Sequence, residues 1–536
     1  MRVLKIFSAP SYYFGVDLRV LSIIIKPMEN NDNILEKLEN RISKISLFSS
    51  KKLNWIIIGI GIILRVAQFI YNRSLTEGEA ALALNIVQRS YSELLKPLDY
   101  VQAAPVGFLI LQRFATNILG SNEYALRFFP LIAGVISLFL FFEIAKKTIN
   151  NKAIPIALIL FAVGDHLIYF ASEVKQYSSD VVLTLLLVLI TFTIMDKNFK
   201  AKYLLLFGFV GGCSFWFSHP ALFTFYAAAI VLLFTIIRRK DWNLFMWLWI
   251  AGIIATTSII INYFVSLESV SANKNLSDFW QHSFMPFPPT TLADIKWFGY
   301  VFLRSFKFPV GLSIYELFLA ALSFFVGCII MFYKKRKILL ILILPIILTL
   351  FASGLHKYPF EGRLLLFITP FMVLIIAEGI GHIQRKMAQN SSFLSLALVC
   401  ILLIQPVILA GYRLIKPRAP EELRPVMHYL NEHHKQGDVI YVYYASLNAF
   451  QYYSSRFDYT DDYIIGIESR ENLSKYYEDL QKLEGNKRVW ILLSHIAVLH
   501  GVDEEKLFVS YLNILGTQLD KFKTSGASAY LYDLSD

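Results

Sequence analysis

The sequence has few of the residues that build soluble, disulfide-bonded or cofactor-binding proteins. Charged residues make up 17% of the 536 positions, whereas soluble domains carry about 25%. Its three cysteines, Cys213, Cys328 and Cys400, each lie inside an apolar run, and none forms a C-x-x-C pair. This pattern excludes a disulfide framework and a cysteine-bound metal. No G-x-G-x-x-G or G-K-[ST] follows a predicted strand, so no nucleotide site is indicated.

The beginning of the chain lacks the pattern of a cleavable signal peptide. Polar and charged residues interrupt positions 1–50, and no apolar core precedes a small-residue cleavage site. Residues 1–27 have an odd composition, and Met28 opens a polar helical stretch. Met28 is therefore an alternative start to Met1.

Apolar residues are abundant and collect in long runs. They form 56% of the chain, and aromatic residues form 15%. A helix of roughly 20 apolar residues crosses the hydrocarbon layer of a membrane. We identify eleven such runs, at 53–71, 126–145, 153–170, 179–195, 203–218, 221–237, 243–264, 312–333, 338–353, 364–381 and 392–411. The sequence predicts a polytopic α-helical membrane protein with about 11 transmembrane helices.

The net charge of +11 is divided unevenly along the chain. From Tyr412 to the end there are 14 Lys and Arg against 18 Asp and Glu, a net charge of −4. The remainder carries 37 against 22, a net charge of +15, which suits contact with anionic lipid headgroups. Nucleic-acid binding requires a basic soluble face, and the acidic C-terminal part argues against it.

Short basic connections alternate with other connections along the eleven runs. One basic cluster precedes the first run, and the others lie in every second connection between runs. They are Lys51-Lys52, Lys146-Lys147 with Lys152, Lys197 with Lys200 and Lys202, Arg238-Arg239-Lys240, Lys334-Lys335-Arg336-Lys337, and Arg385-Lys386. The positive-inside rule places these clusters in the cytoplasm. The N-terminus is then cytoplasmic, and the chain is expected in the inner (plasma) membrane. The connections predicted to lie outside are about 72–125, 171–178, 219–220, 265–311 and 354–363.

Three regions follow from this organisation. Residues 1–52 are predicted to form a cytoplasmic N-terminal segment, 53–411 a membrane domain, and 412–536 a soluble domain outside the cytoplasm. In the last region, PRAPEELRPVMHYLNEH, SKYYEDLQKL and EEKLFVSYLNIL predict helices, whereas DVIYVYYAS, RVWILLSH and ASAYLYDL predict strands. Such alternation is typical of a small α/β domain.

Polar residues on the predicted outer side are the candidates for chemistry. A charged side chain at mid-membrane costs roughly 2.5–3.5 kcal/mol on insertion scales, so it persists where it is paired, hydrated or functional. The candidates are Glu77, Glu79, Asp99, Gln102, Asp165, His166, Glu173, Lys175, Tyr177, His219, His356, Lys357, Glu361 and Arg363. We expect them to share one outward-facing polar cavity.

Glu77 and Glu79 directly follow the first apolar run. A carboxylate at the membrane surface can act as a general base toward an acceptor hydroxyl or water. The alternative is structural: acids in the first turn of a helix stabilise its positive end. Spacing alone does not separate the two interpretations.

The other candidates also have a functional and a structural interpretation. Glu173 and Lys175 either serve a substrate or form a hydrated turn between two spans. His219, before Pro220, either binds substrate or makes a structural hydrogen bond. Arg363, at the start of a span, either offers forked hydrogen bonds to a phosphate or extends to the membrane surface.

Taken together and in this order, these motifs resemble the GT-C glycosyltransferases, specifically the family 39 group that includes protein O-mannosyltransferases and the aminoarabinose transferase of lipid A. The resemblance covers about residues 53–411. It depends on the acidic motif at 77–85, on LDYVQAAPVGFLILQRFATNILGSNEYALRFFPLIAG, on YFASEVKQYSSDV, on WFSHPALF and on the YPFEGR stretch. The C-terminal domain is similar to the domains that bacterial members append.

The resemblance implies a function and roles for several residues. It implies sugar transfer from a polyprenyl-phosphate donor, with inversion at the anomeric carbon, to a glycan, lipid or protein acceptor. A loop-one acid, Glu77 or Glu79, would be the base, and Asp165 a second acid near the catalytic centre. Arg363 and Lys175 would hold the leaving phosphate.

One position departs from the family pattern. Members usually carry an Asp-Glu pair where this chain has Gly78-Glu79. Either Glu77 takes the base role, which the free backbone of Gly78 favours, or Glu79 acts alone, or the protein is weakly active or inactive.

Two other functions and one cofactor stay open at this point. A transporter or flippase is one alternative, although its usual inverted repeats and paired broken helices are absent from the pattern. A non-catalytic scaffold for envelope assembly is the other. Asp165 with a loop-one glutamate offers oxygen ligands to a divalent metal ion, but this pattern is too sparse to predict one.

Overall fold

A computed structural model describes residues 51–268, 278–457, 463–499 and 501–535. The predicted N-terminal segment 1–52, with its alternative start Met28, therefore lies outside the described residues except for Lys51 and Lys52.

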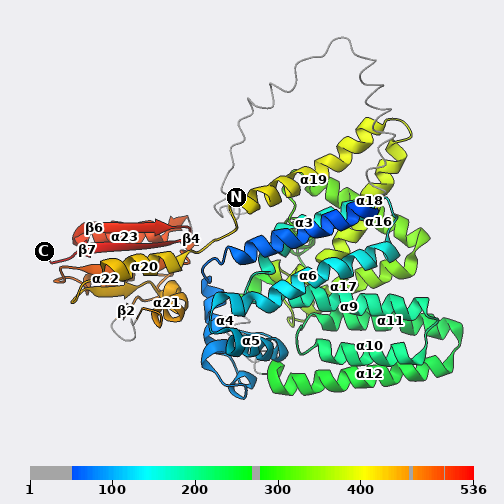
Figure 1. Ribbon diagram of the computed structural model, residues 1–536, viewed down its shortest axis with the longest axis horizontal. Helices are drawn as coiled ribbons and strands as arrows, with labels where there is room; N and C mark the ends of the chain where they lie inside the picture. The colour runs from blue at the N-terminus through cyan, green and yellow to red at the C-terminus, as the bar shows by residue number, and fades with distance from the viewer. Residues whose placement is uncertain (1–50, 269–277, 458–462, 500, 536) are drawn as a thin grey trace, which may run out of the picture. The chain divides into compact units, whose positions relative to one another are not determined.

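Most of the described chain is helical (Figure 1). Nine helices in the described ranges are long and apolar enough to cross a membrane. They are α3 (Lys51–Ile70), α6 (Glu123–Thr148), α9 (Tyr177–Asp196), α11 (Ala221–Arg239), α12 (Trp242–Asn262), α16 (Leu317–Lys334), α17 (Arg336–Gly354), α18 (Thr369–Met387) and α19 (Ser392–Ile415). The predicted polytopic helical membrane fold is confirmed.

Nine of the eleven predicted runs coincide with these long helices. The runs at 153–170 and 203–218 instead hold the shorter helices α7 (Ile154–Val163) and α10 (Ala201–Ser214). α7 is short because the helix ends at Gly164, before α8 (Asp165–Phe170) begins. The connections hold further helices that the runs did not include: α4 (Glu77–Gln88), α5 (Val106–Leu119) and α15 (Leu292–Lys307).

The helix α18 is buried along most of its length. Its residues Thr369–Gly381 are all buried, and it packs against α7, α16 and α19. A helix that is apolar all round requires such a central place. The close approach of α16 depends on glycine, because a Cβ atom at Gly379 would overlap the carbonyl oxygen of Ser323. Small residues let the backbones of membrane helices approach in this way.

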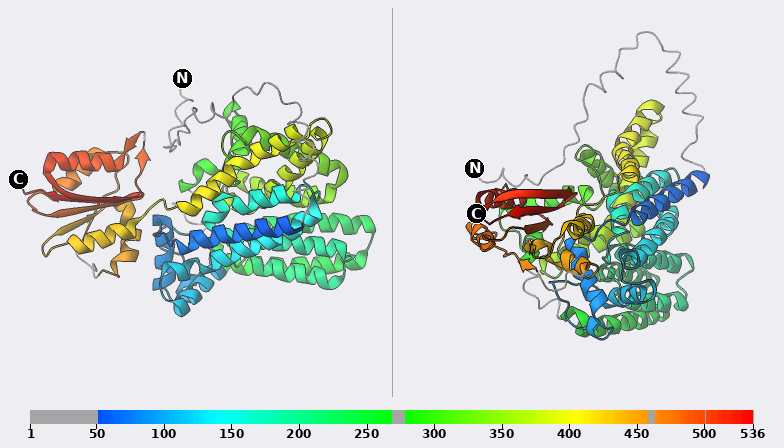
Figure 2. Two further views of the ribbon diagram at one scale, coloured as in Figure 1. Left: turned by 45° about the horizontal axis from the view of Figure 1, so that its top comes forward. Right: turned by 60° about the vertical axis from the view of Figure 1, so that its left-hand side comes forward.

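A second hydrophobic cluster lies among α9, α10, α11 and α12. These helices run alongside one another in Figure 1 and Figure 2, and α10 is packed along α12.

Contacts between Cα atoms divide the chain into two compact units. The membrane unit comprises the described residues of 51–72 and 81–418, and the C-terminal unit comprises Arg73–Ala80 together with the described residues of 419–535. The short segment 73–80, which follows α3, is thus packed with the C-terminal unit.

The C-terminal unit contains a five-stranded sheet in the order β2-β1-β3-β7-β6. Its strands are β1 (Val439–Val442), β2 (Ile464–Ile465), β3 (Val489–Ser494), β6 (Thr517–Thr524) and β7 (Ala527–Asp533), and a separate pair is formed by β4 (Val498–Leu499) and β5 (Val502–Asp503). β1 is parallel to β2 and β3, whereas β7 is antiparallel to β3 and β6. The predicted α/β domain is confirmed.

Helices cover both faces of this sheet. They are α20 (Leu423–His433), α21 (Leu447–Ser454), α22 (Ser474–Gln481) and α23 (Glu504–Leu515). Figure 2 shows α20 and α23 on opposite faces. Burial on both faces explains why β1 and β3 are continuous apolar runs that the sequence reveals. β6 was not predicted, because its edge-strand sequence TQLDKFKT is exposed and largely polar.

Candidate functional site

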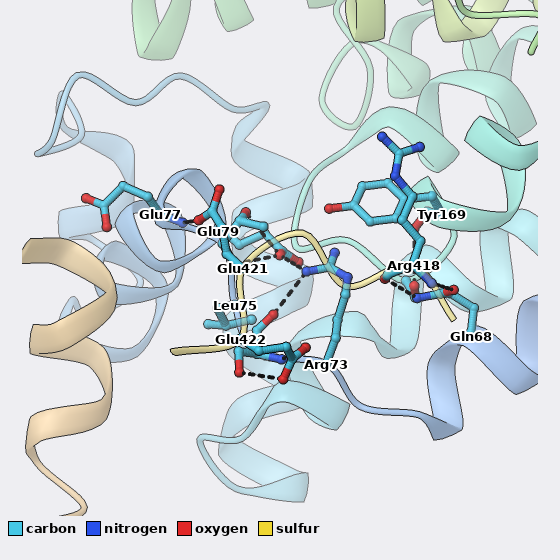
Figure 3. Close-up of polar contacts among 12 residues, drawn as sticks. Gln68, Arg73, Leu75, Glu77, Glu79, Tyr169, Arg418, Glu421 and Glu422 are labelled. Atoms are coloured by element: carbon cyan, nitrogen blue, oxygen red, sulfur yellow. Dashed lines mark hydrogen bonds and ion pairs between the residues drawn. The ribbon is translucent and has the colours of Figure 1, made fainter. Parts of the chain in front are cut away.

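The first group of candidates lies in the segment 73–80 of the C-terminal unit. Glu79 is fully buried and forms an ion pair with Arg73 (Figure 3). The backbone N–H and the hydroxyl of Thr76 also donate to Glu79 Oε2, at 3.0 and 3.2 Å. A neighbouring guanidinium and hydrogen-bond donors favour the ionised form of a carboxyl group. Glu79 is therefore held as a buried carboxylate that can accept a proton.

Glu77 has a different environment from Glu79, although the two residues share the first turn of α4. Its carboxylate accepts hydrogen bonds from Asn448 Nδ2 at 2.6 Å, Asn448 N at 3.2 Å and Ala449 N at 3.0 Å. Burial raises the pKa of the Glu77 carboxyl to about 7, because desolvation outweighs these three hydrogen bonds. In Figure 3 the side chains of Glu77 and Glu79 extend in different directions.

The second group is centred on Asp165 in the membrane unit. Asp165 begins α8, and its two carboxylate oxygens bind Arg413 Nε at 3.0 Å and Arg418 Nη1 at 2.9 Å. The Arg418 guanidinium also lies 4.4 Å from the ring centroid of Tyr169. Gln68 exchanges two hydrogen bonds with the backbone of Arg418, at 2.9 and 3.0 Å (Figure 3). Asp165 therefore anchors the chain that leaves α19.

A third group gathers candidates from three separate segments of the membrane unit. Lys175 is buried and donates from Nζ to Gln102 Oε1 at 2.6 Å. The Arg363 guanidinium lies 5.9 Å from the ring centroid of Tyr177, and the charge of Glu173 acts on it. The fold thus gives Lys175 an amide partner, and it places Arg363 beside a phenol and an acid of the segment that also carries Lys175.

Among the described residues, Asp99 and His219 make no hydrogen bond or ion pair with these groups, whereas His166 adjoins the Asp165 group and is acted on by the charges of Arg418, Asp165 and Arg413. Asp99 is an exposed partner of Arg89 at 2.7 Å. His166 packs edge-on against Phe308, with 3.9 Å between ring centroids, and its buried Nδ1 has no hydrogen-bond partner among the described residues. Burial lowers the pKa of His219 to about 4, so this residue is neutral at physiological pH.

Metal binding finds little support in these groups. Within the described ranges, no three His, Cys, Asp or Glu side chains are arranged to hold a metal ion. Both oxygens of Asp165 already bind arginines, so the carboxylate considered above as a metal ligand is otherwise engaged.

The sequence interpretation missed the partners of its own candidate acids. Arg73 lies six positions before Glu79, and Arg413 and Arg418 follow the last apolar run. A signal for the last two was present: they form a basic cluster after the last apolar run, on the side that the alternation of basic connections predicts to lie outside, where few basic residues are expected. Such an exception indicates basic residues with a specific partner.

Comparisons with known proteins identify the fold. The family model described as dolichyl-phosphate-mannose-protein mannosyltransferase matches residues 102–263. The crystal structure of ArnT from Cupriavidus metallidurans in the apo state is similar over 90% of this chain and 98% of that chain, with a TM-score of 0.53 and 10% identity. The chain has the GT-C glycosyltransferase fold. The resemblance to aminoarabinose transferases, which the motifs predicted, is confirmed at the level of the fold.

Two further comparisons complete the description. ArnT from the same organism, bound to undecaprenyl phosphate, covers 89% of this GT-C chain and 98% of its own, with a TM-score of 0.52 and 9% identity. No curated protein sequence matches the chain. The family model includes Asp165, Glu173, Lys175, Tyr177 and His219 but not the loop-one acids or Arg363.

Proposed function

We propose that this protein is a membrane glycosyltransferase that transfers a sugar from a polyprenyl-phosphate-linked donor to an acceptor at the outer face of the membrane. The GT-C fold, the matching mannosyltransferase family model and the similarity to an ArnT structure that holds undecaprenyl phosphate support this proposal. The sugar and the acceptor are left open.

One observation carries the proposal: Arg363 lies beside Tyr177 and is acted on by the charge of Glu173, although it is far from both in sequence, and the buried Lys175 belongs to the same 173–177 segment. Loss of a prenyl phosphate leaves negative charge on its oxygens. Arg363 and Lys175 would stabilise this charge, and Arg can do so with two parallel hydrogen bonds.

The base in this proposal is Glu79. The acceptor O–H gives its proton to the Glu79 carboxylate while the acceptor oxygen forms a bond to the anomeric carbon. The bond from that carbon to the phosphate oxygen breaks with its electron pair, and the configuration inverts. Glu79 is preferred over Glu77 because the ion pair with Arg73 favours its ionised form, whereas both oxygens of Glu77 are bound by α21.

The proposal is tested with a deletion strain complemented by wild-type protein, Glu79→Gln or Glu484→Gln. Glu484 is an exposed glutamate of the C-terminal unit and serves as the matched control. Mass spectrometry of envelope glycans and prenyl-linked sugars is expected to show a sugar lost on deletion. Wild type and Glu484→Gln should restore it, and Glu79→Gln should not, at equal protein levels. An unchanged glycan profile after deletion would contradict the proposal.

A non-catalytic scaffold is the second candidate. Two observations favour it: Gly78 occupies the usual aspartate position, and both loop-one carboxylates are bound by protein groups. The same experiment separates the candidates, because a scaffold would work equally well with glutamine at position 79.

A further inference from the structure

The helix α21 has an unusual source for its N-terminal cap. Its N-cap residue, Ser446, makes no side-chain capping hydrogen bond. The first backbone N–H groups of a helix lack partners within the helix and usually bond to a nearby side chain. Here the N–H groups of Asn448 and Ala449 donate to the two oxygens of Glu77, which is 371 and 372 positions away in sequence.

The side chain of Asn448 strengthens this contact. Its Nδ2 donates to Glu77 Oε1 at 2.6 Å, the shortest of the three hydrogen bonds. α21 follows directly after β1, which lies between the parallel strands β2 and β3. Its amino end thus lies where the strand order of the sheet reverses, a place where α/β domains commonly bind ligands. In this protein the Glu77 carboxylate occupies the amino end of α21.

The residues before Glu77 are bound by the same unit. Ser74 donates from its N–H and its hydroxyl to the Glu422 carboxylate, at 3.1 and 3.0 Å. The N–H of Leu75 donates to the Tyr453 hydroxyl at 2.8 Å, and that of Glu77 donates to Glu421 Oε2 at 2.8 Å. Three of four successive backbone donors in 74–77 are therefore bound by residues of 419–536.

We propose that Asn448 and the amino end of α21 position the catalytic segment. Their three hydrogen bonds to the Glu77 carboxylate, which we call the clasp, fix the backbone that carries Glu79. This inference rests on the proposed function for its catalytic part. Glu79 follows Glu77 by two residues in the same helical turn, so a clasp on one limits the movement of the other. Glu77 is then a positioning residue for Glu79.

The clasp is tested first without any activity measurement, by hydrogen exchange on the full-length protein in detergent. Glu77→Ala removes all three acceptor contacts, Asn448→Ala removes one donor, and Tyr453→Phe removes the hydroxyl that binds Leu75 N. In each variant the amides of 73–80 are expected to exchange at least tenfold faster than in wild type. Glu484→Ala and Tyr477→Phe are the matched controls. Exchange in Glu77→Ala that equals the wild-type rate would overturn the clasp.

Kinetics then test the positioning of Glu79. With prenyl-linked sugars extracted from the producing cells as donor, Asn448→Ala and Glu77→Ala are expected to lower kcat about tenfold and leave the KM for the donor within about twofold. Unchanged kcat in variants with faster exchange would overturn the positioning role. If even wild type transfers no sugar while exchange still responds to Glu77→Ala, the clasp stands and the proposed function fails.

Discussion

The carboxylate of Asp165 is bound by Arg418 Nη1 at 2.9 Å, across 253 positions of sequence. With Arg413 on its other oxygen, this acid joins the start of α8 to the chain that leaves α19. The resemblance implies a place near the catalytic centre for Asp165. The contacts show that it also has a structural task that the sequence did not reveal.

Asp165→Asn is therefore expected to destabilise the membrane unit. The substitution leaves two partly buried arginines without their carboxylate, and removal of one member of a buried ion pair costs roughly 3 kcal/mol. We expect a clear decrease in the thermal unfolding temperature. Asp99→Asn is the matched control, since its side chain is 65% exposed and its pair with Arg89 is worth about 0.5 kcal/mol or less. Equal shifts for both variants would contradict this interpretation.

Gly379→Ala is expected to disturb the contact between α18 and α16. A methyl group there overlaps the Ser323 carbonyl oxygen, so the helices must separate. Overpacking of this kind costs about 1–3 kcal/mol. Gly252→Ala in α12 is the control, because a Cβ atom at that position meets nothing within 4 Å. Thermal unfolding in detergent should distinguish the two, and a Gly379→Ala protein as stable as the control would argue against close packing.

Stability of the C-terminal unit is expected to fall as the pH rises through neutrality. The pKa of Glu77 is raised from 4.5 to about 7, so its contribution is fully present below its unfolded pKa and is lost as the pH rises through about 7. Glu421 raises the pKa of His495, which acts in the same direction. Allowing for partial exposure, the loss for Glu77 is roughly 2 kcal/mol.

This pH dependence of the free energy of unfolding is measured by denaturation at a series of pH values, with hydrogen exchange in β3 as the readout for the C-terminal unit. Glu77→Gln does not titrate and should reduce the pH dependence. Glu484→Gln should retain the wild-type slope. A Glu77→Gln protein with the full wild-type slope would show that other groups cause it.

Gly78→Asp is expected to be tolerated and to raise sugar transfer. A Cβ atom at position 78 meets nothing within 4 Å, and an acid in the first turn of α4 suits the positive end of the helix. The substitution also restores the Asp-Glu pair that the family resemblance leads us to expect. Transfer rates compared with wild type and with Gly78→Asn test it. Equal rates for Asp and Asn would show that a carboxylate at this position is not what limits activity.

The apolar runs predicted all nine of the long helices among the described residues. Runs of apolar residues such as 364–381 predict spans because the cost of placing a residue in hydrocarbon depends on that residue and its neighbours. The strands β1 and β3 were predictable for a related reason, since burial on both faces leaves a continuous apolar pattern. The edge strand β6 left no such pattern.

The partners of the charged residues could not be predicted without the folded structure. Glu77 and Glu79 are two positions apart, yet one binds the amino end of α21 and the other binds Arg73. Asp165 meets two arginines from the far end of the membrane unit. Hydropathy is a local property of the chain, whereas an ion pair depends on which distant segments fold together. The sequence therefore shows which residues are charged but not which residues they contact.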